Sequence, residues 1–188
     1  MIHEEYRKLV KPVTSEIAEV LSNIAPGDIE TLYGEITKAG KIFITAAGRS
    51  LLSLKCMAMR LTHLGFNVQQ VGSVTAQPVA KGDLLLIASG SGRSKITREF
   101  AAIARANNAR VGVITSTPES GMKDVADFTV CIPSHLKVEP RTGTKSIQAM
   151  WTLFDQSLHV FGDILCRIIQ TQKGLKDSDL WARHANLE

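Results

Sequence analysis

The sequence predicts an α/β protein in which a single five-stranded parallel sheet is covered by helices on both faces. A chain of 188 residues, 44% of them hydrophobic, is long and apolar enough for one domain with a sizeable core. Between residues 41 and 133, short apolar runs alternate with segments of helical periodicity. The runs are apolar throughout, which is typical of parallel strands with helices packed on either side. We therefore expect residues 1–188 to form one three-layer domain.

The N-terminal segment, residues 1–40, is predicted to be helical. Its first helix has an apolar stripe, and Pro12 is expected to kink this helix or to mark a restart. A second helix is expected to start at Asp28 as N-cap and to run to about Lys38, with Gly40 ending it. The apolar stripe suggests that the first helix packs against a partner.

The sheet core, residues 41–133, contains five short apolar runs bounded by turn or charged residues. Such runs are typical of buried strands when helical segments separate them. Helices are expected at about 50–65, from Ser94 to Asn107 and, as a shorter element, around 120–126. The expected strands are KIFITAA, FNVQQVG, DLLLIAS, RVGVITS and DFTVCIP.

The C-terminal part, residues 146–188, is predicted to begin with a long helix at residue 146. The loop PSHLKVEPRTGTKS precedes this helix, and the polar tail after Gly174 is expected to be frayed. The long helix should pack on the sheet and, together with the N-terminal helix, on another subunit.

Composition excludes several classes of protein. The net charge of +4 comes from scattered Lys and Arg rather than from a basic stripe, which argues against nucleic-acid binding. No apolar run reaches the length of a membrane span, and the N-terminus lacks a secretory signal, so a cytoplasmic protein is expected. Cys56, Cys131 and Cys166 are widely spaced without metal-ligand spacing, and they are interpreted as buried free thiols with no metal site.

Two turns rich in glycine and serine each follow a predicted strand: AAGRS at 46–50 and ASGSGRSK at 88–95. In an open parallel sheet, ligands bind beyond the carboxyl ends of the strands. Hydroxyls and backbone amides at helix N-termini suit a phosphate monoester. The alternative is that the serines only cap the two helices. The residues expected to bind the substrate are Gly48 and Ser50 in the first turn, and Ser89, Gly90, Ser91, Gly92 and Ser94 in the second.

The pair of serine turns resembles the sugar isomerase (SIS) domain, a flavodoxin-like fold that binds phosphosugars. Further stretches are similar in order and spacing to the 6-phospho-3-hexuloisomerase family: AAGRSLLSLKCMAMRLTHLGFNVQQVG, GDLLLIASGSG, TSTPES, SIQAMWTLFDQSL and RHANLE. The resemblance implies a cofactor-free enzyme that interconverts D-arabino-hex-3-ulose 6-phosphate and fructose 6-phosphate through a cis-enediolate. It also implies a role in formaldehyde fixation or pentose phosphate supply.

The resemblance implies roles for particular residues. Asp155 matches the family's glutamate in SLFEQ and is the expected catalytic base; its alternative is an ordinary carboxylate paired with His159. His184 is the expected group for ring opening or proton shuttling, and its alternative is a solvated tail histidine. Arg49 is expected to neutralise the phosphate or the enediolate, and its alternative is a surface salt bridge. Gln148 is expected to contact sugar hydroxyls, and its alternative is simple exposure on a helix.

Some positions depart from the family's pattern. Arg93 stands where glutamate is frequent; the alternatives are that it strengthens phosphate binding, that it points to solvent, or that it indicates a different acidic substrate. Trp151, Ala76 and Gln77 also differ, and all four positions are expected around the pocket. The substrate therefore stays open between this hexulose phosphate and a different sugar phosphate, with a non-catalytic phosphosugar-binding module as a further alternative. His63 is expected to be structural. By analogy with SIS domains, we expect a homotetramer built as a dimer of dimers.

Overall fold

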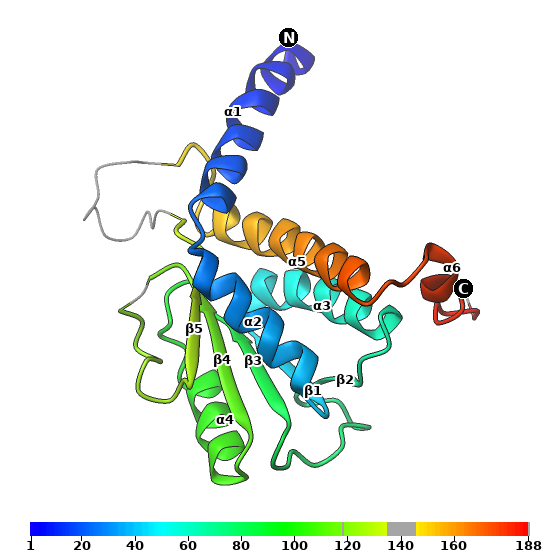
Figure 1. Ribbon diagram of the computed structural model, residues 1–188. Coiled ribbons are helices and arrows are strands. Elements are labelled where there is room, and N and C mark those ends of the chain that lie inside the picture. Colours follow the sequence, from blue (N-terminus) through cyan, green and yellow to red (C-terminus); the bar gives the residue numbers. More distant parts are fainter. Residues whose placement is uncertain (118, 135–145, 188) are drawn as a thin grey trace.

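A single parallel sheet forms the centre of the computed structural model, which describes residues 1–117, 119–134 and 146–187 (Figure 1). The strand order is β2-β1-β3-β4-β5, and all four neighbouring pairs are parallel. Flavodoxin-like folds have this strand order, in which β2 and β3 lie on opposite sides of β1. The strands are β1 (Ile42–Ala46), β2 (Val68–Gln70), β3 (Leu84–Ala88), β4 (Arg110–Thr115) and β5 (Phe128–Cys131). The predicted fold class is confirmed.

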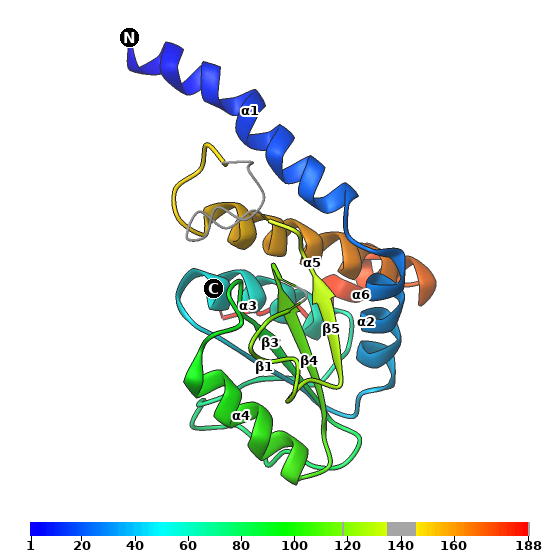
Figure 2. The same cartoon turned by 90° about the vertical axis from the view of Figure 1, so that its left-hand side faces the viewer.

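Helices pack on both faces of the sheet, as expected (Figure 2). Alternate strand residues point to opposite faces: Ile42 and Ile44 belong to a larger buried cluster, whereas Phe43 belongs to a smaller one. The larger cluster includes buried residues of α1 (Ile2–Ser22), α2 (Pro26–Lys38), α3 (Gly48–His63) and α5 (Thr152–Gln172), and the smaller includes residues of α4 (Lys95–Ala106).

The N-terminal helix α1 (Ile2–Ser22) continues through Pro12 as one helix, so the expected restart is wrong. Its second half contacts α5, where Val20 is buried, whereas its first half extends away from the body of the protein (Figure 1). Tyr6 and Leu9 remain 69% and 53% exposed on that first half. Among the described helices, none is long and apolar enough to cross a membrane.

The start of α2 also differs from the prediction. Ala25 is the N-cap and Pro26 occupies the first turn, where its fixed φ favours a helix start. The carboxylate of Asp28, expected to cap this helix, instead accepts a hydrogen bond of 2.8 Å from the backbone amide of Cys131. Asp28 thus connects α2 to the end of β5.

Two further helix predictions are wrong. Residues 121–125 form hydrogen-bonded turns rather than a short helix. The long helix begins at Thr152 and not at 146, because Met150 has a left-handed backbone with φ at 53°, which a helix cannot include. The predicted loop over 133–146 lies mostly outside the described residues.

The C-terminal tail is partly ordered, contrary to the expected fraying. It forms the short helix α6 (Asp177–Trp181), which contacts α3. The guanidinium of Arg183 donates a hydrogen bond of 3.4 Å to the backbone carbonyl of His63 and lies against Gly65. The tail is therefore attached to the C-terminal end of α3.

Candidate active site

The two serine-bearing turns meet at one edge of the sheet. Ala46 and Ala88, the last residues of β1 and β3, are partners in the strand register, so the turns that follow them are neighbours. A cavity of about 620 Å³ opens between these turns and the start of α5. It is lined by Ala47, Gly48, Arg49, Ser50, Ala88, Ser89, Gly90, Ser91, Arg93, Ser94, Ala149, Met150, Trp151, Thr152 and Asp155. Most of the predicted substrate-binding residues are therefore brought together.

Gly92 belongs to the second turn but does not line the cavity. Its φ of 62° lies in the left-handed region, and its amide donates to both the carbonyl and the hydroxyl oxygen of Ser89, each at 3.1 Å. A Cβ at this position would lie 2.3 Å from the Cβ of Ser120. Both the backbone conformation and the lack of space require glycine here.

Gly90 is held by the end of the neighbouring strand. Its carbonyl accepts hydrogen bonds from the hydroxyls of Ser116, at 2.6 Å, and Thr115, at 3.2 Å. On the other side, a Cβ at Gly90 would lie 2.8 Å from the indole of Trp151. The turn is thus fixed between β4 and the residue that precedes α5.

The capping alternative for the serines is not supported. Ala47, not a serine, is the N-cap of α3, and Ser50 donates its hydroxyl to Asp155. Ser94 is the N-cap of α4, but its side chain makes no capping hydrogen bond within the described part of the chain. The first-turn amides of both helices have no intrahelical acceptor, and they are suited to bind an anion.

Asp155 lies in the first turn of α5 and is only 4% exposed. Its Oδ1 accepts a hydrogen bond of 2.7 Å from Ser50, and its Oδ2 lies 3.4 Å from the Nε of Arg49, whose side chain is 64% exposed. Its backbone carbonyl accepts a further hydrogen bond of 2.8 Å from Ser53. The N-terminal turn of α3 therefore orients this carboxylate at the cavity wall.

Comparison with known proteins identifies the family. The family model described as the SIS domain matches residues 35–160. The chain belongs to the SIS domain family. Its 3-hexulose-6-phosphate isomerase relative in Bacillus subtilis is 36% identical over 179 residues, which cover 95% of this chain and 97% of that protein. The enzyme of the same name in Mycobacterium gastri is 35% identical over 176 residues, covering 94% and 88% of the two chains.

A solved structure supports the same grouping within the SIS family. A protein of Methanococcus jannaschii, whose crystal structure infers a molecular function of 3-hexulose-6-phosphate isomerase, matches with a TM-score of 0.83 and 30% identity. The match covers 96% of this chain and 99% of that one. The resemblance to the 6-phospho-3-hexuloisomerase family, stated from sequence motifs, is confirmed.

Two predicted contacts are not found in this SIS domain. Gln148 precedes α5, and its Nε2 donates a hydrogen bond of 3.0 Å to Glu16 instead of lining the cavity. His159, the alternative partner of Asp155, has its Nε2 3.6 Å from the carboxylate of Asp163. The alternative of a simple Asp155–His159 pair is therefore wrong.

Two of the family departures also lie elsewhere. Ala76 and Gln77 line a separate, mostly apolar cavity of about 170 Å³ against α4, so they do not surround the candidate site as expected. Arg93 and Trp151 do line the candidate site. Asp155, which stands where the family has glutamate, lines it as well.

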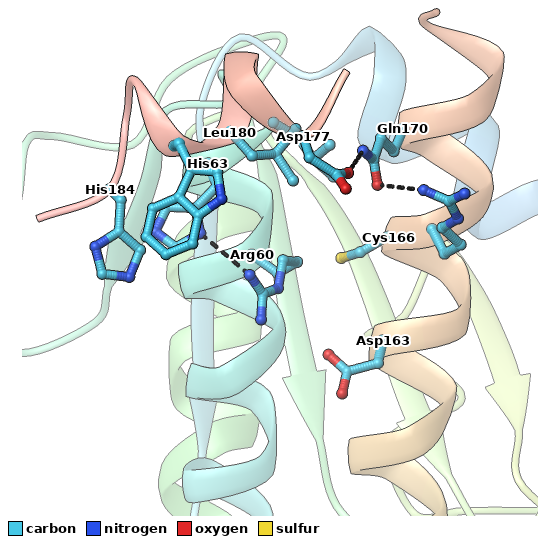
Figure 3. A pocket seen from close by; sticks show the side chains of 11 residues that line it. Arg60, His63, Asp163, Cys166, Gln170, Asp177, Leu180 and His184 are labelled. Carbon is cyan, nitrogen blue, oxygen red and sulfur yellow. Dashed lines mark hydrogen bonds between the residues drawn. The ribbon is translucent and has the colours of Figure 1, made fainter. Parts of the chain in front are cut away.

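His184 lies in a second cavity of about 510 Å³, between α6 and the C-terminal halves of α3 and α5 (Figure 3). The His184 ring is 5.1 Å from the ring of His63 and 5.1 Å from that of Trp181. At ~1.5 Å per helical residue, α3 spans roughly 20 Å between Ser50 and His63. His184 is therefore not brought together with Asp155 in the same chain.

Charged and polar side chains line this second cavity. Figure 3 shows Arg60, Asp163 and Cys166 projecting into the space between α3 and α5. The Nη1 of Arg60 lies 3.5 Å from the Nδ1 of His63, which is itself 6% exposed, in keeping with its expected structural role. Burial raises the pKa of the Cys166 thiol to about 12, so this thiol stays protonated at neutral pH.

The three cysteines are free, and Cys166 is buried while Cys56 and Cys131 are partly exposed. Within the described ranges, no group of three or more His, Cys, Asp or Glu side chains could hold a metal ion.

Sequence reasoning missed two parts of the site. Thr115 and Ser116 hold the second turn, and the rule that sites lie beyond the strand ends could have indicated them, because they end β4 at the same edge. The place of Met150 in the cavity wall gives no signal, because its left-handed conformation has no sequence signature in a non-glycine residue.

Proposed function

We propose that this SIS domain interconverts D-arabino-hex-3-ulose 6-phosphate and fructose 6-phosphate, as a 3-hexulose-6-phosphate isomerase. One observation carries the proposal: the buried carboxylate of Asp155 lines the same cavity as the two serine-bearing turns. The turns suit a phosphate group, and the carboxylate suits proton transfer on the attached carbon chain. The curated relatives of this name match over nearly the whole chain and support the same assignment.

The reaction moves a carbonyl group from C3 to C2 of the sugar. With the phosphate at the serine turns, Asp155 removes the proton from C2 to give a cis-enediolate and returns it to C3, while the hydroxyl proton passes from O2 to O3. One carboxylate above one face of the sugar can perform both transfers. Arg49, with its Nε 3.4 Å from Oδ2 of Asp155, is placed to stabilise the negative charge of the enediolate. The substrate and product have the same atoms, so no second substrate enters.

We infer that the site is shared between two copies of the chain. Asp155 and His184 lie toward opposite ends of the α3–α5 helix pair. Two copies that pair with these helices antiparallel would place His184 of one copy beside Asp155 of the other, as a two-fold axis allows. A cytoplasmic homotetramer, built as a dimer of dimers, would contain four such sites.

A coupled assay tests the proposed activity. Ribulose 5-phosphate and formaldehyde are incubated with a hexulose-phosphate synthase, this protein is added, and fructose 6-phosphate is followed. We expect production that falls at least about 100-fold in Asp155→Asn, because general acid–base catalysis contributes at least that much. Glu30→Gln, which removes an exposed carboxylate on α2, is the matched control and should keep full activity.

Other outcomes would point elsewhere. Activity that is unchanged in Asp155→Asn would assign the base to another residue. If the assay forms no fructose 6-phosphate, but added fructose 6-phosphate raises the melting temperature of the protein, the protein is a phosphosugar-binding module or an isomerase of another sugar phosphate. Turnover of a related ketose phosphate that is lost in Asp155→Asn would identify an isomerase of another sugar phosphate. Arg93 and Trp151, which line the cavity, would then be the residues to substitute in order to change the substrate.

A further inference from the structure

A glutamate of α1 binds the segment that precedes α5. The carboxylate of Glu16 accepts hydrogen bonds of 2.8 Å from the hydroxyl of Ser146, 2.8 Å from the amide of Ile147 and 3.0 Å from the side chain of Gln148. The Ser146 hydroxyl in turn accepts a hydrogen bond of 2.9 Å from the amide of Gln148. One carboxylate thus holds three consecutive residues that are about 130 positions away in the sequence.

The residues 146–151, here termed the strap, end in the wall of the candidate active site. Ala149, Met150 and Trp151 line the cavity, and the Trp151 indole packs against Gly90 of the second serine turn. Asp155 follows within the first turn of α5. The position of the strap therefore determines both the width of the cavity and the packing on the phosphate turn.

Packing alone gives the strap little support. Ile147 and Met150 are 53% and 79% exposed, and the backbone of Met150 is in the strained left-handed region. Ser146 and Gln148 are buried, and their polar groups need partners. Hydrogen bonds to a carboxylate are about twice as strong as neutral ones, so Glu16 is a strong anchor at this end of the strap.

Glu16 is itself held by the core. The neighbouring Ile17 packs against the buried cluster, and Val20, one turn further, is 5% exposed within it. The second half of α1 contacts α5. The carboxylate thus stands on a fixed helix, although the first half of that helix extends away from the protein.

We propose that Glu16 is a positioning residue for the active site, which acts through the strap to place Trp151 against Gly90 and so to set the cavity for the sugar phosphate. The expected effect of Glu16 on KM rests on the proposed isomerase function, whereas its effect on the packing of Trp151 does not. No residue of α1 lines the cavity, so Glu16 does not contact substrate.

The kinetic test compares three variants. In Glu16→Gln, the new amide group would face the donors of Ser146 and Gln148, and we expect KM for the sugar phosphate to rise about tenfold, with a smaller change in kcat. Glu16→Asp keeps the negative charge, so its KM should rise less than that of Glu16→Gln. Glu19→Gln, an exposed position one turn on, is the matched control and should leave KM unchanged. A merely structural role would lower the active fraction, and thus kcat, while KM stays the same.

The structural test needs no turnover. In a Trp181→Phe background, Trp151 is the single tryptophan, and its emission reports on the packing against Gly90. We expect Glu16→Gln to shift this emission to longer wavelength and to increase quenching by acrylamide, whereas Glu19→Gln should change neither. Unchanged emission and unchanged KM in Glu16→Gln, with only a lower melting temperature, would overturn the proposal. A wild-type protein without isomerase activity would reject the proposed function, and the fluorescence would still decide the role of Glu16.

Discussion

The backbone at Gly92, within the second serine-bearing turn, adopts a left-handed conformation with φ at 62°. We predict that Gly92→Ala destabilises the protein by roughly 3 kcal/mol or more, because the strain of this φ adds to the clash of the new Cβ with Ser120. The loss should also abolish phosphosugar binding, since the amide of Gly92 bonds Ser89. Urea unfolding and a thermal shift with fructose 6-phosphate measure the two effects.

Gly72 supplies the control for this prediction. It has a φ of 85°, but an added Cβ would meet no atom within 4 Å. Gly72→Ala should therefore cost only the backbone strain, about 1 kcal/mol, and leave binding intact. Equal losses of stability in Gly92→Ala and Gly72→Ala would show that the contact with Ser120 is not important.

At the scale of the elements, α3 and α5 pack against each other next to the site. A Cβ at Gly162 of α5 would lie 2.9 Å from the Cβ of Met57 on α3. We predict that Gly162→Ala destabilises the protein by about 1–2 kcal/mol, although alanine favours helices by about 1 kcal/mol over glycine. Because Asp155 is held by hydroxyls of α3, separation of the pair should also lower turnover. Urea unfolding and the coupled assay test both expectations.

Gly34 is the matched position on α2. It is also within a helix, but an added Cβ there would meet nothing within 4 Å. Gly34→Ala should stabilise the protein by up to about 1 kcal/mol and leave turnover unchanged. A stabilising Gly162→Ala would show that the helix pair tolerates a wider spacing than the structure has.

The elements that the sequence predicts well are those whose pattern does not depend on distant residues. The sequence predicts each strand to within two residues at either end, because a buried parallel strand is apolar along its whole length. The serine turns were found for the same reason, since each directly follows such a strand. Their meeting in one cavity follows from the strand order.

The elements that were predicted wrongly depend on contacts distant in sequence. Helical periodicity extends through residues 146–151, yet α5 starts at Thr152 because Glu16 and Gly90 hold the strap in another conformation. The polar tail was expected to fray, but α6 forms against α3, with Arg183 bonded to the carbonyl of His63. Neither contact leaves a periodic signal in the sequence.

At the scale of the whole molecule, an apolar surface on α1 has no cover within the described part of the chain. Ile2, Tyr6 and Leu9 are exposed by 87%, 69% and 53%, on a half-helix that extends from the body. Clustered apolar side chains of this kind mark association surfaces. Together with the separation of Asp155 from His184, this surface supports assembly with further copies of the chain.

If two copies of the chain share each site, mixtures of two inactive variants should regain activity. Asp155→Asn and His184→Ala should each lose activity as homo-oligomers, because every site lacks one of the two groups. When they are co-expressed in equal amounts and purified together, one site in each mixed pair combines an intact Asp155 with an intact His184. With random pairing, about a quarter of all sites are then complete, and about a quarter of wild-type turnover should return. If the mixed assemblies stay inactive, either both groups act within the site of one chain or His184 takes no part in the reaction. Full activity of His184→Ala alone would show directly that His184 takes no part.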